Sequence, residues 1–235
     1  IVVCEGAYHG GLLYFGHGGE ALLAPFDFTR VRYNDIDALT AIDDSIAAVL
    51  IEPMMGAGGC IPAQQEYLTA LRRRCDEMGS LLIFDEVITG FGRTGNPFGA
   101  NTYDVQPDMI TMAKALTNGA IPMSAVGVGE QVYKAIVEAA PDKGVDFFHG
   151  YTYSGHPAAC AAGLATLDIF EKEDMFGRAK ALSKPFLDRF FDLKDLPIIT
   201  NMRGVGLLAA IDLAPDGAPG TRGYQAVMDL SVSYT

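Results

Sequence analysis

Three features are scarce in this 235-residue sequence: cysteine, positive charge and long apolar runs. The four cysteines are far apart and show neither Cys-x-x-Cys spacing nor the density of a secreted scaffold: Cys4, Cys60, Cys75 and Cys160. They predict buried thiols in a reducing compartment, and therefore a cytoplasmic protein. The 17 Lys and Arg residues face 29 Asp and Glu residues, a net charge of -12 without any block of like charges. We therefore expect no nucleic-acid partner.

No uninterrupted apolar run reaches the roughly 18 residues that a membrane span needs. Glu52, Asp85 and Glu86 interrupt the best candidates. We therefore expect a soluble protein with no membrane partner. The sequence starts on an apolar, strand-like run, Ile1–Cys4, without a charged leader region or a small-residue cleavage site. This start is expected for the inside of a longer polypeptide.

The composition, 49% hydrophobic and 20% charged, is typical of a soluble enzyme with a real core. Short aliphatic runs alternate with amphipathic stretches, which predicts an α/β fold with a mostly parallel sheet flanked by helices. The expected strands are residues 47–52, 81–84, 109–112 and 124–128, and the expected helices are residues 62–77, 130–139, 158–172 and 175–192.

The last part of the sequence has a different pattern of expected strands and helices. Residues 197–202 and 205–212 are expected strands, separated by Arg203-Gly204. We expect residues 1–174 to form a large domain that lacks its N-terminal part. Residues 175–235 are then a connecting helix and the start of a small, truncated α+β domain.

Ligands of open α/β sheets bind beyond the carboxyl ends of the strands, and polar residues follow two of the predicted strands directly. Asp85 and Glu86 follow residues 81–84 and point to opposite faces of an extended segment, so they are a poor pair for joint acid–base chemistry. Either can still face a ligand alone. Lys114 follows residues 109–112. A partly desolvated lysine is an amine nucleophile that forms Schiff bases, although an isolated lysine at a strand end more often only reaches water.

A third polar place is the segment GYTYSGHP, residues 150–157, directly before an expected helix. Hydroxyls and free backbone N–H groups at a helix start bind phosphate, although Ser154 or Thr152 could equally serve as an ordinary N-cap. A lysine, a buried carboxylate and a phosphate cradle together are what pyridoxal phosphate requires. An acid against the pyridine nitrogen keeps the ring protonated and makes it an electron sink.

Several blocks of the sequence resemble one enzyme family. LLIFDEVITGFGRTG at residues 81–95, PDM at 107–109 and AKALTNG at 113–119 resemble the signature of class III aminotransferases, which are fold type I pyridoxal-phosphate enzymes. YHG at 8–10 and TYSGHP at 152–157 match two further blocks of that family in the expected order. The resemblance therefore covers nearly all of the chain.

The resemblance implies a role for each matching position. Lys114 would form the Schiff base with the cofactor, and Asp85 would pair with the pyridinium nitrogen. Val87 would pack on one face of the ring and Tyr8 would stack on the other. Thr152 would bind the phosphate of the partner subunit's cofactor, which implies a homodimer or a dimer of dimers.

Glu52 matches a family position near the substrate, although Met54-Met55 departs from the more usual pattern after it. Residues 118–123 and 149–157 are most similar to the ω-amino acid:pyruvate (β-alanine:pyruvate) branch. The resemblance implies ping-pong transamination, in which an ω-amino acid or amine gives its amino group to a keto acid, with pyruvate as the expected acceptor.

Two alternatives remain open. One is an enzyme similar to glutamate-1-semialdehyde aminomutase, which has nearly the same core blocks. The other is an inactive fragment, because family members are considerably longer than this chain. A nicotinamide oxidoreductase is a poor choice because the glycine motif at residues 203–209 leads into a strand instead of following one. No metal is expected, because the spacings of His9 with His17 and of His149 with His156 fit no recognised site.

Overall fold

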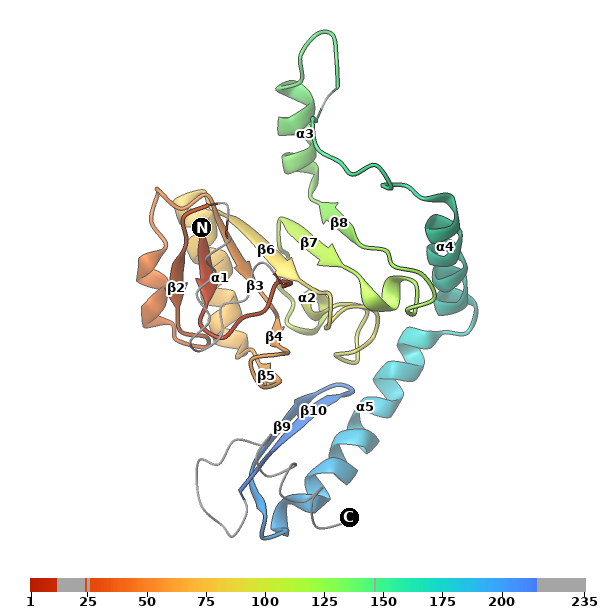
Figure 1. The fold of residues 1–235 in the computed structure, drawn as a ribbon. Helices are drawn as coiled ribbons and strands as arrows, with labels where there is room; N and C mark the ends of the chain where they lie inside the picture. The colour runs from red at the N-terminus through yellow and green to blue at the C-terminus, as the bar shows by residue number, and fades with distance from the viewer. Residues whose placement is uncertain (12–23, 25, 146, 215–235) are drawn as a thin grey trace.

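The structure, a computed structural model, describes residues 1–11, 24, 26–145 and 147–214 (Figure 1). Its centre is a six-stranded sheet in the order β2-β1-β3-β6-β7-β8. All neighbours are parallel except β7 and β8, which confirms the predicted mostly parallel sheet. The strands are β1 (Val2–Cys4), β2 (Thr29–Val31), β3 (Ala48–Ile51), β6 (Leu81–Asp85), β7 (Met109–Met112) and β8 (Ala125–Val128).

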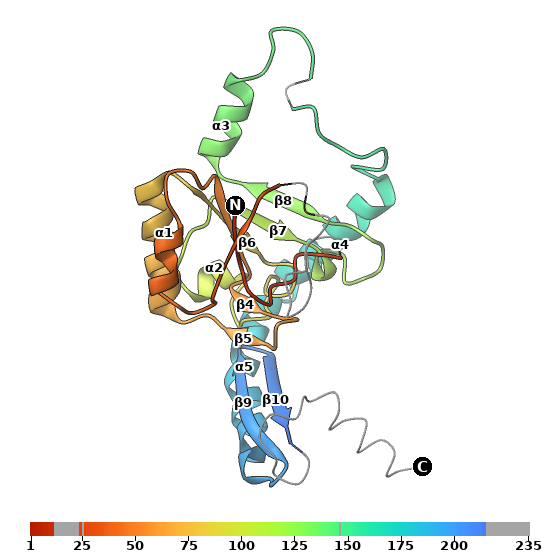
Figure 2. The same ribbon diagram turned by 60° about the vertical axis from the view of Figure 1, so that its left-hand side comes forward.

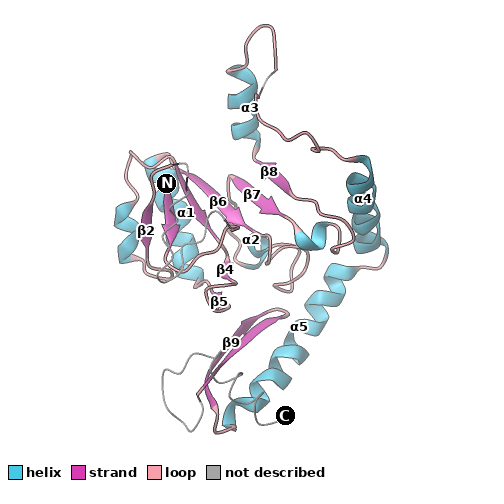
Figure 3. Ribbon diagram, in the orientation of Figure 1, coloured by secondary structure: helices cyan, strands magenta, loops and turns pink. Residues whose placement is uncertain are grey.

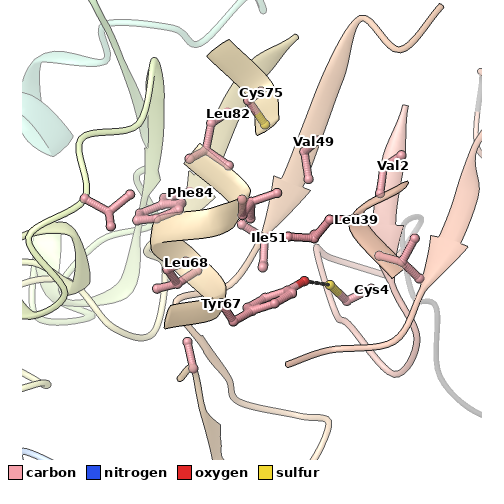
Figure 4. Close-up of a cluster of buried hydrophobic side chains, with 14 of the residues drawn as sticks. Val2, Cys4, Leu39, Val49, Ile51, Tyr67, Leu68, Cys75, Leu82 and Phe84 are labelled. Atoms are coloured by element: carbon pink, nitrogen blue, oxygen red, sulfur yellow. Dashed lines mark hydrogen bonds between the residues drawn. The ribbon is translucent and has the colours of Figure 1, made fainter. Parts of the chain in front are cut away.

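The core lies between the middle strands of this sheet and α1 (Gln65–Met78). Tyr67, Leu68, Leu71 and Cys75 recur at intervals of one, three and four residues, and all four are buried. Figure 4 shows Tyr67, Leu68 and Cys75 of the helix against Val49, Ile51, Leu82 and Phe84 of β3 and β6. The Tyr67 hydroxyl and the Cys4 thiol are hydrogen bonded at 3.7 Å. Each side chain of this size contributes roughly 1.5–3 kcal/mol when it is fully buried.

The helix was expected to begin at Pro62, and this boundary is wrong. Pro62 pairs with Met54 in a short antiparallel ribbon, so the chain is still extended there, and α1 begins three residues later. The ribbon consists of β4 (Met54–Met55) and β5 (Ile61–Pro62).

The remaining helices are α2 (Gly99–Thr102), α3 (Glu130–Glu138), α4 (Pro157–Lys172) and α5 (Met175–Phe191), with short 3-10 helices η1 (Asp37–Ala41), η2 (Lys114–Leu116) and η3 (Asp192–Asp195). Of these, α3, α4 and α5 follow the sheet in the chain and extend away from it, whereas α2 lies beside the sheet (Figures 1 and 3). None of the α3 residues is buried, whereas α4 buries Ala159, Gly163 and Thr166. Within the described ranges, no helix combines the length and the apolar character that a bilayer crossing would require.

The chain then forms an antiparallel hairpin of β9 (Ile199–Val205) and β10 (Leu208–Leu213), which lies beside α5 (Figure 2). The prediction that Arg203-Gly204 separates the two strands is wrong, because both residues lie inside β9. The turn is at Gly206, whose φ of 62° is in the left-handed region that glycine adopts without steric cost. Gly204 fits in the strand because a Cβ there would lie 2.6 Å from the Leu208 carbonyl oxygen.

Two contacts dock this hairpin onto the rest of the protein. The Arg203 Nε donates to the Gly59 carbonyl at 2.6 Å, while its two terminal nitrogens bind the Asp212 carboxylate at 2.7 and 2.9 Å. At the turn, the Leu207 N–H donates to the Arg93 carbonyl at 2.8 Å. Residues 215–235 of the expected small domain, and His17, lie outside the described residues.

Candidate active site

The carboxyl ends of four neighbouring parallel strands meet at one edge of the sheet, and polar residues follow each of them. Tyr8 and His9 come after β1, Glu52 comes directly after β3, Asp85 is the last residue of β6, and Lys114 comes after β7. Ligands of open α/β sheets bind at such an edge. This edge is therefore the candidate active site.

Asp85 is an ionised carboxylate held by three hydrogen bonds. Only 9% of the residue is exposed, and the His9 Nδ1 lies 2.8 Å from its Oδ2. The Val87 backbone N–H and the Thr111 hydroxyl each donate to its Oδ1 at 3.1 Å. Burial alone would raise the pKa of Asp85, but the bonds from His9, Val87 and Thr111 outweigh it and hold the pKa below its ordinary value. Asp85 is thus negatively charged at neutral pH.

The neighbouring Glu86 points to the other side of β6, as the sequence predicted. It is fully buried and accepts hydrogen bonds from the Thr89 hydroxyl at 2.6 Å, the Gly99 N–H at 2.7 Å and the Ala100 N–H at 2.8 Å. Burial raises the pKa of Glu86 although these bonds oppose the rise. Glu86 therefore holds the start of α2, and Asp85 alone faces the strand-end site.

Glu52 is 3% exposed, and both of its carboxylate oxygens accept backbone N–H groups. Tyr8 donates to Oε1 at 3.1 Å and Gly56 donates to Oε2 at 2.9 Å. The Tyr33 hydroxyl donates to the Glu52 carbonyl at 2.8 Å. Burial raises the pKa of Glu52, against the lowering effect of the two backbone bonds. Glu52 thus ties the loop after β1 to the turn after β4.

Lys114 opens η2, one residue after the end of β7 at Met112, and has a φ of 45°. This left-handed value costs a residue with a side chain about 1 kcal/mol or more. Its side chain is exposed and lines a cavity of about 930 Å³. The wall of the cavity comes from the loop after η2 and from the segment that leads into α4, including Thr117, Ser124, Tyr151, Tyr153, Ser154 and His156.

The predicted site residues fall into two groups. Tyr8 contacts Glu52, and Val87 contacts Asp85, at the ends of β1, β3 and β6. Lys114 belongs to the cavity, and among the described residues none of those four lines it. Thr152 is exposed in the turn before α4, between Tyr151 and Tyr153, and is not itself part of the cavity wall.

Two residues of the site were missed by the sequence analysis. From the sequence, His9 was considered as a metal ligand and that role was rejected, whereas in the structure its ring is hydrogen bonded to Asp85 itself. Its place next to Tyr8, in the YHG block, was the available signal. Thr111 is the cross-strand neighbour of Asp85 in the parallel pair of β6 and β7. Strand register is needed to find it, and the sequence does not supply the register. No three His, Cys, Asp or Glu side chains in the described part of the chain gather into a metal site.

Comparison with known proteins shows which family the chain resembles. The class-III aminotransferase family matches residues 26–230. The chain is 46% identical over 195 residues to an omega-aminotransferase of Caulobacter vibrioides, which covers 82% of this chain and 44% of that protein. It is 43% identical over 201 residues to a beta-alanine--pyruvate aminotransferase of Pseudomonas aeruginosa, covering 84% and 45%. The chain thus spans about half the length of the curated relatives it matches.

Solved structures share the fold. A transaminase from the marine bacterium Virgibacillus is 34% identical with a TM-score of 0.81, covering 94% of this chain and 53% of that one. A transaminase from a study of ancestral reconstruction is 33% identical with a TM-score of 0.82, covering 92% and 54%. These likenesses confirm the predicted α/β architecture of fold type I. The chain belongs to the class-III aminotransferase family.

Proposed function

We propose that the protein is a pyridoxal-phosphate-dependent transaminase. It would move an amino group from an ω-amino acid or amine similar to β-alanine to a keto acid such as pyruvate, by a ping-pong mechanism. The observation that carries the proposal is the ionised, buried Asp85 at the same sheet edge as Lys114. The omega-aminotransferase and beta-alanine--pyruvate aminotransferase relatives support this choice of substrates.

The residues present fit the cofactor. A carboxylate accepts about four hydrogen bonds, and three reach Asp85, so one acceptor position is left for a pyridinium N–H. Lys114 offers an exposed amine on the wall of a cavity of about 930 Å³, within the range of ordinary ligand pockets. When bound, pyridoxal phosphate supplies an electron sink that stabilises negative charge on the amine-bearing carbon.

Each residue then has a defined task. Lys114 would hold the cofactor through its Nζ at rest, and, once released by a donor amine, this Nζ would accept the proton from the amine-bearing carbon. Asp85 would hold the pyridine nitrogen protonated. Tyr8 and Val87 would cover the two ring faces, and Thr152 would donate its hydroxyl to the phosphate in a partner subunit.

This role for Thr152 requires a homodimer or a dimer of dimers. Large apolar side chains support such an assembly, because they are exposed on the segment before α4 and on α4: Phe148 (96%), Tyr153 (81%), Tyr151 (78%) and Leu164 (67%). Free cysteines support the proposed cytoplasmic location, since all four lack a disulfide. We propose the same division as from the sequence, with a large cofactor domain in residues 1–174 and a smaller one starting in residues 175–235.

A panel of amine donors and keto acceptors tests the function. We expect β-alanine and pyruvate to yield alanine, with no yield from a Lys114→Ala variant and normal yield from Lys180→Ala, a control on the exposed face of α5. Conversion of glutamate 1-semialdehyde without any acceptor would instead support the aminomutase alternative. Absence of turnover in dimeric, cofactor-saturated protein would support the inactive fragment.

A further inference from the structure

Glu52 is a second acid at the strand-end site, beside Asp85, and the proposed chemistry leaves it without a task. A residue that binds a substrate ammonium presents its carboxylate to the open cavity, and Glu52 is not among the residues that line the cavity beside Lys114. Glu52 is 3% exposed, and each of its oxygens already accepts a backbone N–H, from Tyr8 at 3.1 Å and from Gly56 at 2.9 Å. Both bonds are directed at main chain, so the side chain fixes the path of two loops.

The loop after β1 depends on hydrogen bonds of this kind for its position. It carries Tyr8 and His9 between Gly6 and Gly10, whose φ values of 81° and 103° are in the region that glycine adopts freely. Two acids hold it from neighbouring strands. Glu52 binds the Tyr8 N–H, and Asp85 binds the His9 ring at 2.8 Å. Because Tyr8 and His9 are consecutive, a loop released at Tyr8 also loses its alignment at His9.

We propose that Glu52 is a positioning residue, which fastens the Tyr8–His9 segment so that His9 stays on Asp85 and Tyr8 stays over the cofactor site, and that it does not bind substrate. The proposal rests on the proposed function in one respect, because Tyr8 and Asp85 are its cofactor-binding residues. A buried carboxylate on two amides is well suited to the task, since hydrogen bonds to charged groups are about twice as strong as neutral ones.

The charge of Glu52 is not retained for stability. Burial raises its pKa above the ordinary value of 4.5, so the folded protein holds this proton more tightly than the unfolded chain, and stability falls as pH rises from 4.5 through the folded pKa. His9 opposes this shift and Asp85 adds to it. Tyr33 and Cys4 also face Glu52, and burial raises their pKa values, which keeps both protonated at neutral pH.

Glu52→Gln is the direct test, with the exposed Glu66→Gln on α1 as the matched control. A glutamine has one acceptor oxygen, so its NH₂ group must face the N–H of Tyr8 or Gly56. In cofactor-free protein we expect amide hydrogen exchange of residues 6–10 and of Gly56 to be about tenfold faster or more, with exchange in α1 unchanged. We also expect the dissociation constant of pyridoxal phosphate to rise about tenfold, with the donor KM at saturating cofactor unchanged.

Unchanged exchange at residues 6–10 and Gly56 would overturn the proposal. So would a raised donor KM with unchanged cofactor affinity, because that pattern belongs to a residue that touches substrate. If the wild-type protein bound no pyridoxal phosphate, the proposed function would fail, whereas the exchange measurement would still decide the role of Glu52.

A double-mutant cycle with His9→Gln adds a second readout. Both variants act on cofactor affinity through one loop, so their effects on the dissociation constant should fall well short of additive, whereas additive effects would contradict the shared route. Should Glu52→Gln fail to fold, the wild-type protein still gives an answer. Exchange at Tyr8, corrected for its intrinsic pH dependence, should accelerate as pH falls through the raised pKa of Glu52, and a flat profile would overturn the proposal.

Discussion

The two sides of the candidate site differ in how completely they are enclosed. The carboxylate side contains Tyr8, Glu52 and Asp85, and the lysine side contains Lys114 and the segment before α4. Among the described residues, the large side chains that are fully buried all lie between Val2 and Glu86, on the carboxylate side. The lysine side is bounded by η2 and the loop after it, by the segment before α4 and by the start of α4, and its cavity wall includes the exposed Tyr151 and Tyr153.

This difference matches two requirements of the proposed chemistry. An acid that must stay charged while buried needs fixed donors around it, and Asp85 receives them from three strand ends of the same chain. In the proposed function, the amine of Lys114 exchanges partners with substrate and needs access, and the side chain of Lys114 is exposed. The carboxylate side is therefore preorganised, whereas the lysine side is accessible to substrate and to a partner subunit in the proposed assembly.

The largest expected effect is on the lysine side. Lys114→Arg retains the positive charge but removes the nucleophilic amine, so we expect turnover to fall on the order of 10⁴-fold or more. Because the side chain is exposed, the free energy of unfolding should change by less than about 0.5 kcal/mol. Steady-state kinetics and urea denaturation measure the two quantities. A large loss of stability would show that the lysine side is as tightly built as the carboxylate side.

Asp85→Asn should affect both activity and stability. Loss of the fixed charge is expected to lower turnover by about 10²–10³-fold. Mismatched donors at His9, Val87 or Thr111 are expected to lower the free energy of unfolding by about 1–3 kcal/mol. Asp142→Asn, in an exposed loop, is the control for both assays. Unchanged stability would mean that the three donors do not depend on this carboxylate.

Substitutions of apolar side chains should have different effects on the two sides. Phe84→Ala on β6 removes a fully buried ring and should lower the free energy of unfolding by about 3–5 kcal/mol. Leu164 on α4 is 67% exposed. Leu164→Asp should change the free energy of unfolding of the monomer by less than about 0.5 kcal/mol, and should instead weaken self-association about tenfold or more. Sedimentation and denaturation together measure this contrast. Unaltered association would argue against α4 as part of the proposed subunit contact.

The smallest expected effect is a difference in pH dependence between Asp85 and Glu86. The lowered pKa of Asp85 gives stability that is present above pH 3.8 and is lost as pH falls through the folded pKa. The raised pKa of Glu86 has the opposite sign, so stability falls as pH rises from 4.5 through its folded pKa. Denaturation of wild type, Asp85→Asn and Glu86→Gln between pH 3 and 8 should show these opposite trends, and trends of the same sign would contradict the assignment of environments.

Much of this fold follows from local pattern. The strand at 81–84, the helix ending before Gly79 and the opposite directions of Asp85 and Glu86 were all predictable, because each depends on neighbours in the sequence. The bond between His9 and Asp85 was not, since it joins residues 76 positions apart through strand order. The turn at Gly206 was placed too early for a similar reason. Only the pairing of β9 with β10 distinguishes Gly204 inside a strand from Gly206 at its end.

The docking of the hairpin also affects how the protein reaches its native state. The bond from Arg203 to the Gly59 carbonyl spans 144 residues, and the bond from Leu207 to the Arg93 carbonyl also joins parts of the chain that are remote in sequence. Contacts of such long sequence separation are slow to form, because loop-closure entropy is lost before the contacts stabilise the chain. The hairpin is therefore expected to dock after the sheet has formed. Destabilising substitutions at the hairpin turn would then accelerate unfolding more than they slow folding.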